Sequence, residues 1–265
     1  MSTALIEPVA ALMRQVAAEV VMPRFRALAA HEVIEKGPGD LVTVADRESE
    51  LRLGEGLAKI LPEARMIGEE AVSADASLLD GIGEGLAWIV DPIDGTSNFA
   101  EGITPFAIMI ALIGDGDVQA SWILDPVTGR LLHAVQGGGA FVNGERVTTR
   151  PTGKPLPVAA LATQFLPSEV RADFEARTPG RLENVSVPRC AGEQYPRVVL
   201  GQNDAALFWR AHPWDHAPGA LILTEAGGRI ARFDGVAYRP GVPGLGLIAA
   251  ATPALWDEIR QVLLG

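Results

Sequence analysis

The chain has 265 residues, enough to bury a large core, and 48% of them are hydrophobic, a composition that excludes a disordered or low-complexity protein. The formal net charge of -11 repels polyanions, and no stripe of lysine and arginine follows the sequence, so DNA and RNA polymers are excluded as ligands.

Cysteine content and apolar runs bear on the expected compartment. The single cysteine, Cys190, excludes an internal disulfide. The N-terminal residues lack the basic start and apolar stretch of a signal peptide. The most apolar run, residues 106–113, is far shorter than the roughly 20 residues that cross a bilayer. We therefore expect a cytoplasmic protein with no membrane partner.

The N-terminal region is predicted to begin with two helices around a short strand. Apolar residues recur at helical spacing over residues 5–28, and Pro23 is expected to kink or end this helix. A turn-rich stretch and a strand over residues 41–44 follow, and residues 45–61 form the second predicted helix. Asp46 falls in the first turn of that helix.

A sheet is predicted from the next segments. A short strand at residues 66–67 leads into a loop through residue 83, and an apolar strand over residues 86–90 ends at Asp91. Between residues 106 and 135, strand-like runs are separated by turn signals, which predicts an antiparallel meander. An Asn-Gly hairpin follows.

The sequence suggests two halves, 1–150 and 151–265. The stretch 150–155 is rich in proline and glycine and is the best linker candidate. Strands then alternate with helical patterns, which indicates an α/β half. The predicted strands are residues 158–161, 184–187, 205–209 and 247–250.

Acidic residues gather at four separate places in the chain. They are Asp46, the pair Glu69-Glu70, the run from Asp91 to Asp94, and Asp215 after Pro213-Trp214. Almost no histidine or cysteine accompanies them, and carboxylates alone suit hard cations such as Mg²⁺ rather than zinc or copper. Bound cations would also make a phosphate ester acceptable to this acidic chain.

The run that follows the strand at 86–90 carries the most specific chemistry. Pro92 removes a backbone donor from the ladder and Gly95 permits an abrupt turn, so Asp91 and Asp94 can face one point. A helix is expected to begin at Thr96 and Ser97, where free N–H groups and hydroxyls could hold a phosphate.

Each acidic group alone has an ordinary explanation as a helix cap or solvated surface, but together these explanations are improbable. One alternative is the Asp-x-Asp-Gly-Thr mark of haloacid-dehalogenase-type phosphatases, whose first aspartate attacks phosphorus. The spacing here is Asp-x-x-Asp-Gly-Thr, which disfavours it. The four histidines show no zinc spacing.

The chain resembles the inositol monophosphatase family of lithium-sensitive Mg²⁺ phosphatases over nearly its whole length. Two signatures carry the resemblance, the run from Trp88 to Phe99 and the run from Pro213 to Ala220 with Glu225-Ala226-Gly227-Gly228 after it. It implies a layered αβαβα sandwich, of the α+β or α/β class, and a homodimer with the active site between the halves of each chain.

The resemblance also implies which residues bind metal. Glu69, Asp91 and the carbonyl of Ile93 would hold one Mg²⁺, and Asp91, Asp94 and Asp215 would hold a second. A third, weaker Mg²⁺ near Glu69 is also implied, with Glu70 supporting the ligands.

Catalytic and phosphate-binding roles follow from the same resemblance. Thr96, hydrogen-bonded to Asp46, would orient or deprotonate the attacking water, and Glu69 would share that task. Phosphate would bind at Gly95, Thr96 and Ser97. A mobile loop from Lys36 to Asp46 would cover the site.

The sequence leaves the substrate open. The glutamate that grips sugar hydroxyls in inositol-specific members is missing from residues 207–212, where Arg210 could accept a second anionic group. Other candidate substrate contacts are Asp94, Asp215, Ala191, Gly192 and Glu193. Inositol phosphate, histidinol phosphate, nucleotide 3′(2′),5′-bisphosphates, fructose 1,6-bisphosphate and NADP are all candidates. A metal- or phosphate-binding protein without turnover is the alternative from another class.

Overall fold

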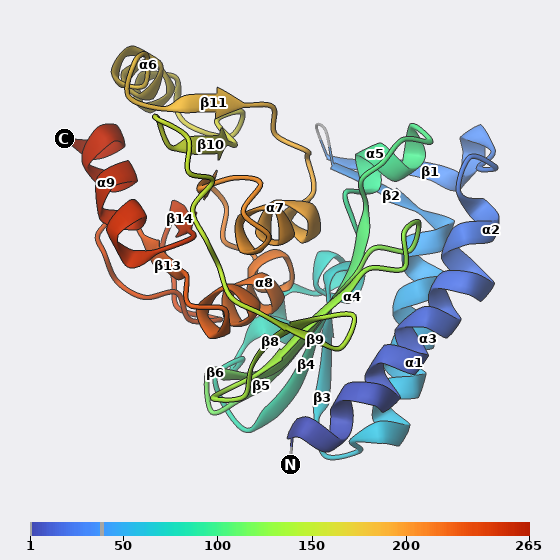
Figure 1. Ribbon diagram of the computed structural model, residues 1–265. Coiled ribbons are helices and arrows are strands. Elements are labelled where there is room, and N and C mark those ends of the chain that lie inside the picture. The colour runs from blue at the N-terminus through green and yellow to red at the C-terminus, as the bar shows by residue number, and fades with distance from the viewer. Residues whose placement is uncertain (1, 38–39) are drawn as a thin grey trace.

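Helical and sheet layers alternate through the molecule (Figure 1). The computed structural model describes residues 2–37 and 40–265. Helices α1 (Ile6–Val16) and α3 (Val44–Ile60) cover one face of a seven-stranded sheet. Helices α7 (Ala191–Val199) and α8 (Pro213–Glu225) lie between that sheet and a five-stranded one, which α6 (Ser168–Arg177) and α9 (Pro253–Leu264) cover on the outside. The predicted αβαβα sandwich is confirmed. Residues 38 and 39, inside the loop expected to cover the site, lie outside the described residues.

The first predicted helix is real but not uniform. It consists of α1 (Ile6–Val16), a π-helical turn (Ala17–Val21) and α2 (Met22–Arg24). The break agrees with Pro23, which has no N–H to continue the ladder, and the chain leaves the helix at Phe25 and turns. Next come β1 (Val33–Gly37), β2 (Asp40–Thr43) and the helix α3 (Val44–Ile60). Strand β2 and α3 lie close to their predicted positions. Strand β1, which pairs with β2 in an antiparallel hairpin, was not predicted.

The seven-stranded sheet contains the predicted meander. Its strands, in spatial order, are β3 (Arg65–Gly68), β4 (Leu86–Asp94), β5 (Ala107–Gly114), β6 (Asp117–Leu124), β7 (Leu131–Val135), β8 (Gly139–Val142) and β9 (Glu145–Val147). Only β3 and β4 are parallel within it, and the other neighbours are antiparallel. Strand β4 is buried almost throughout, which matches its apolar sequence.

One segment predicted as a loop is helical. After β3 the chain forms α4 (Glu69–Ala74) and a 3₁₀ turn (Ala76–Leu79). The reason is a cap from a distant residue: both oxygens of Glu50 on α3 accept backbone N–H groups of α4, from Glu70 and Ala71, at 2.8 Å each. No local pattern reveals such a cap.

The five-stranded sheet is mixed. Its order is β11 (Glu183–Val185), β10 (Val158–Leu161), β12 (Ala205–Phe208), β14 (Leu247–Ala250) and β13 (Arg229–Arg232). Strand β10 is parallel to both neighbours, whereas β14 is antiparallel to both of its own. Four of these strands were predicted and β13 was not. The helices are α6 (Ser168–Arg177), α7 (Ala191–Val199), α8 (Pro213–Glu225) and α9 (Pro253–Leu264).

The core follows the layers. One buried cluster lies between α1, α3 and the large sheet and includes Trp88 and Trp122, and a second joins both sheets through α7 and α8. The boundary at residue 150 stays a prediction, because α8 packs against strands of both sheets. Among the described helices, none has the length and apolar character to cross a bilayer.

Candidate active site

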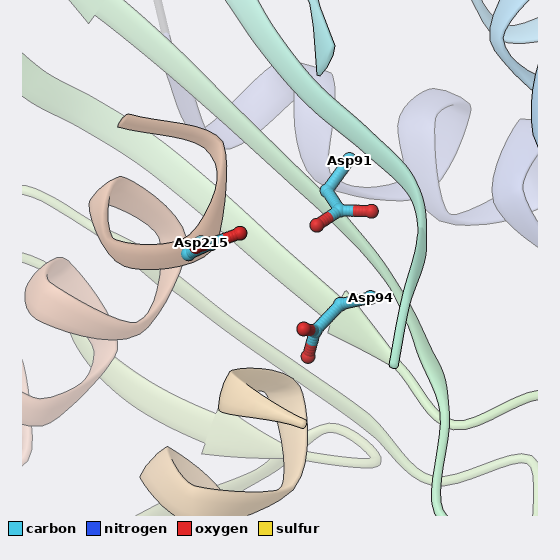
Figure 2. A group of neighbouring side chains, drawn as sticks. All are labelled: Asp91, Asp94 and Asp215. Atoms are coloured by element: carbon cyan, nitrogen blue, oxygen red, sulfur yellow. The ribbon is translucent and has the colours of Figure 1, made fainter. Parts of the chain in front are cut away.

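Three carboxylates, two buried and one half-buried, converge between the large sheet and α8. Asp91 and Asp94 come from the end of β4, and Asp215 comes from the first turn of α8 (Figure 2). One carboxylate oxygen of each lies within 4.8 Å of those of the other two. Residues more than a hundred positions apart therefore form one acidic group, as their sequence context predicted.

The end of β4 is shaped to turn both aspartates the same way. The ladder with β5 shifts register between Asp91 and Asp94, which is a local bulge. Asp91 Oδ1 accepts the N–H of Ile93 at 3.1 Å. Gly95 then takes a left-handed conformation with φ of 88°, and a Cβ there would lie 3.1 Å from the Pro105 carbonyl oxygen, so glycine is required.

The start of α7 holds Asp94 in place. Asp94 Oδ2 accepts the N–H of Gly192 at 2.5 Å and the thiol of Cys190 at 3.0 Å. Burial, and then the neighbouring Asp94 carboxylate, raise the pKa of the Cys190 thiol well above its ordinary value, so the thiol stays a donor. Gly192 and Cys190 thus orient a carboxylate, which is a different task from contacting substrate.

Helix α4 brings the two glutamates to the same region. Lys36 Nζ lies 3.0 Å from Glu70 Oε1 and 3.6 Å from Glu69 Oε1. Glu69 lines the cavity that also contains Asp94 and Asp215. Glu50 fixes the start of α4 from α3 and thereby the position of Glu69. Lys36, predicted in a mobile loop, lies at the end of strand β1.

Thr96 and Asp46 are in direct contact. Thr96 Oγ1 lies 3.1 Å from Asp46 Oδ1 and 3.0 Å from the carbonyl oxygen of Ile93. The other oxygen of Asp46 accepts the hydroxyl of Thr43 at 2.5 Å and its N–H at 2.8 Å, which forms the cap of α3. Asp46 is therefore both a helix cap and the partner of Thr96.

Burial and mutual repulsion raise the pKa values of these acids. Burial raises the pKa of Asp91 well above its ordinary value, and repulsion from Glu69 and Asp94 adds to the rise. For Glu69 the pKa is raised by burial and then by Asp215. Burial also raises the pKa of Asp94, against its hydrogen bonds from Cys190 and Gly192, and that of Asp46, to about 7.

The donor set fits Mg²⁺. Carboxylates and the carbonyl of Ile93 are hard oxygen ligands, and the closeness of Asp91, Asp94 and Asp215 is unfavourable when all are ionised without a cation. A divalent cation bound here would offset the burial and the repulsion that raise the pKa of Asp91. The residues present therefore suit the metal that the family resemblance implies.

A cavity of about 800 Å³ opens over the acidic group. Most of the residues predicted to bind substrate line it, namely Asp94, Gly95, Thr96, Ser97, Ala191, Arg210 and Asp215. Gly192 and Glu193 are not among the lining residues: the N–H of Gly192 bonds to Asp94, and the carboxylate of Glu193 forms ion pairs with Arg130 and with Arg197, the latter at 2.8 Å. Substrate contacts by Gly192 and Glu193 stay predictions.

Sequence reasoning missed two contributions. Glu50 sits inside a helix without any motif, so no sequence signal identified it. His216 directly follows Asp215, but the sequence does not reveal its contacts. Its Nε2 lies 2.9 Å from the carbonyl oxygen of Arg210, and its Nδ1 lies 2.8 Å from the hydroxyl of Tyr195.

Comparison with known proteins agrees with the site. The profile of the Inositol monophosphatase family matches residues 3–263. An inositol-1-monophosphatase of Mycobacterium leprae is 34% identical over 240 residues, which cover 85% of this chain and 79% of that protein. A fructose-1,6-bisphosphatase/inositol-1-monophosphatase of Thermotoga maritima is 30% identical over 204 residues and 76% of each chain.

Other relatives have a different name. A Nus factor SuhB of Pseudomonas aeruginosa is 33% identical over 230 residues, with 83% of this chain and 82% of that protein covered. Among solved structures, the Thermotoga maritima IMPase superposes with a TM-score of 0.82 at 27% identity, over 99% of this chain and 97% of that one. Family profile, relatives and fold agree: the chain belongs to the inositol monophosphatase family.

Proposed function

We propose that the protein is a Mg²⁺-dependent phosphomonoesterase that hydrolyses a small phosphate ester by in-line attack of water. The observation that carries the proposal is the convergence of Asp91, Asp94 and Asp215 beside a cavity large enough for a phosphorylated metabolite. Inositol monophosphate is the reference substrate, because relatives of about 30% identity bear that activity in their names.

Each acidic residue has a distinct part in this proposal. Glu69, Asp91 and the Ile93 carbonyl would hold one Mg²⁺, and Asp91, Asp94 and Asp215 a second, with a third and weaker ion beside Glu69. When bound, the cations supply a nucleophilic hydroxide near neutral pH and stabilise the leaving oxygen.

The remaining residues bind and orient. Gly95, Thr96 and Ser97 line the cavity next to Asp94 and would receive the phosphoryl oxygens. The contact between Thr96 and Asp46 at 3.1 Å supports a role in orienting water, since a hydroxyl that donates to Asp46 keeps its lone pairs toward the cavity. Lys36 and Glu70 pair with each other beside Glu69 and would set its orientation.

Phosphate release from the purified chain tests the proposal. Inositol 1-phosphate, histidinol phosphate, adenosine 3′,5′-bisphosphate, fructose 1,6-bisphosphate and NADP would be assayed with Mg²⁺ and with EDTA. Asp94→Asn is expected to lower kcat about 100-fold or more while the protein stays folded. Asp173→Asn, on the exposed face of α6, is the matched control and keeps full activity. Normal turnover by the Asp94→Asn protein would refute the assignment.

The Nus-factor relatives favour one alternative, a binding protein that has no turnover. The assay above separates the two, because such a protein releases no phosphate from any ester at any Mg²⁺ concentration. The homodimer, the lithium sensitivity and the cytoplasmic location remain predictions. Sedimentation of the purified chain and inhibition by LiCl would test the first two.

A further inference from the structure

Arg210 is a basic residue of the cavity that hydrolysis of a simple ester does not need. It is exposed and lines the same cavity as Asp94 and Asp215. Among the side chains that the structure describes, no carboxylate lies in ion-pair distance of its guanidinium. Arg189, on the wall of the same cavity, differs because Glu101 pairs with it at 2.9 Å. The charge of Arg210 therefore has no acidic partner among these described side chains.

The guanidinium is nevertheless held in position. Its Cζ lies 3.9 Å from the centre of the Phe165 ring, a cation–π contact that restrains the side chain. Phe165 also lines the cavity and is 44% exposed, so the contact lies on the cavity wall. The contact uses none of the N–H donors of Arg210, which remain available to a ligand.

The backbone of Arg210 is fixed as well. Its carbonyl oxygen is 2.9 Å from His216 Nε2, and since a carbonyl only accepts, Nε2 carries the proton. The hydroxyl of Tyr195 lies 2.8 Å from Nδ1 on the other side of the ring. Tyr195 and His216 are both buried, and His216 directly follows Asp215 in the chain. The hydrogen-bond chain therefore ties the position of Arg210 to that of a carboxylate in the acidic group.

We propose that Arg210 forms an anion subsite for the alcohol part of the substrate, so that the preferred substrate is a phosphomonoester whose alcohol carries a second anionic group. The inference rests on the proposed phosphomonoesterase function. The reacting phosphate would sit at the carboxylates and the second anion at Arg210. In the reaction, water oxygen bonds to phosphorus, the ester P–O bond breaks, and the alcohol leaves with a proton and its second anion intact.

Charge complementarity excludes other substrate classes at this subsite. A neutral polyol leaves Arg210 without a partner, and a cationic amino alcohol such as histidinol is repelled by it. A phosphate or carboxylate instead accepts two parallel N–H bonds from a guanidinium. The two anions share this chemistry, so matched substrates must distinguish them.

Paired substrates test the subsite. With free Mg²⁺ held constant, kcat/KM would be compared for fructose 1,6-bisphosphate against fructose 6-phosphate, inositol 1,4-bisphosphate against inositol 1-phosphate, and 3-phosphoglycerate against glycerol 3-phosphate. In at least one pair, the substrate with the second anionic group is expected to have a kcat/KM about tenfold higher or more, mostly through a lower KM. The third pair distinguishes a carboxylate from a second phosphate. Histidinol phosphate is expected to be the poorest substrate.

Variants connect the preference to one side chain. Arg210→Gln is expected to bring the ratio for the favoured pair to about one, and Arg210→Lys, which keeps the charge but not the planar fork, to an intermediate value. Arg181→Gln, an exposed arginine outside the cavity, is the matched control and keeps the wild-type ratio. Ratios near one in all three wild-type pairs, or a ratio that survives Arg210→Gln, would overturn the subsite.

Failure of the subsite and failure of the phosphatase proposal are distinguishable. Turnover of all esters without preference for the second anion rejects the subsite alone. No turnover of any ester rejects the phosphatase proposal, and calorimetry then tests the subsite directly. Fructose 1,6-bisphosphate is expected to bind wild type about tenfold more tightly than Arg210→Gln. Equal affinities would reject the subsite in that case too.

Discussion

Tyr195 and His216 share one hydrogen bond in the interior, and it has a direct consequence for stability. Burial lowers the pKa of His216 from 6.5 to about 3, so the ring is neutral at physiological pH. With its proton on Nε2, Nδ1 must accept, and the hydroxyl of Tyr195 must donate. Both groups are removed from water, so each depends on the other.

We expect Tyr195→Phe to lower the free energy of unfolding by about 1–3 kcal/mol, because it leaves Nδ1 of His216 buried without a donor. Urea unfolding followed by circular dichroism measures this. Tyr238→Phe is the matched control. Within the described part of the chain the buried hydroxyl of Tyr238 has no hydrogen-bond partner, so its removal should cost nothing or stabilise. Equal losses in the two variants would contradict the hydrogen-bond assignment.

Individual residues also show what the sequence could predict about the site. Asp91, Asp94 and Asp215 were identifiable because each follows a strand or begins a helix, which are local features. The orientation of Glu193 was not, because it depends on Arg130, which is distant in the chain, as well as on Arg197, one helical turn away. Gly192 was predicted as a substrate contact, but its bond to Asp94 depends on how the start of α7 lies against the end of β4, which no local pattern reveals.

At the scale of elements, α4 depends on a residue of another helix. Glu50 accepts two N–H groups at the start of α4, and any side chain at Gly68 would collide with it. Because α4 carries Glu69, the cap should influence metal binding as well as helix stability.

Glu50→Ala is therefore expected to destabilise the protein by about 1–2 kcal/mol and to raise the Mg²⁺ concentration needed for half-maximal activity about tenfold. Thermal unfolding and Mg²⁺ titration of phosphate release measure the two effects. Glu55→Ala, an exposed position on the same helix, should change neither. A Glu50→Ala protein that loses stability but keeps its Mg²⁺ dependence would show that α4 does not position Glu69.

Elements with strong periodicity were predictable and short ones were not. The meander of β5 to β7 follows from apolar runs between turn signals, and α3 follows from the apolar residues of a long helical segment. Strand β13 has the sequence Arg-Ile-Ala-Arg, which is too short and too polar for a strand pattern. It exists because β14 offers a partner, a tertiary cause that one sequence cannot reveal.

For the whole molecule, the acidic group places function and stability in opposition. Burial raises the pKa values of Glu69 and Asp91 well above their ordinary range in the folded protein. Repulsion from Asp215 adds to the rise for Glu69, and repulsion from Glu69 and Asp94 adds to it for Asp91. Folding without a cation therefore favours their protonated forms. The net charge of -11 adds general repulsion to this local one.

The sign of the pH dependence follows. When a carboxyl has a higher pKa in the folded state, the folded state binds more protons. Stability therefore decreases as pH rises from the ordinary carboxyl pKa of about 4 through the raised pKa.

The melting temperature of the metal-free protein should thus decrease between about pH 5 and 8. Mg²⁺ binds only the folded, ionised site. It should therefore raise the melting temperature, and by a larger increment at pH 8 than at pH 5. Scanning fluorimetry in EDTA and in MgCl₂ at both pH values measures this, with Asp94→Asn as a variant whose Mg²⁺ increment should shrink. An equal increment at both pH values would mean that these carboxylates do not bind the cation.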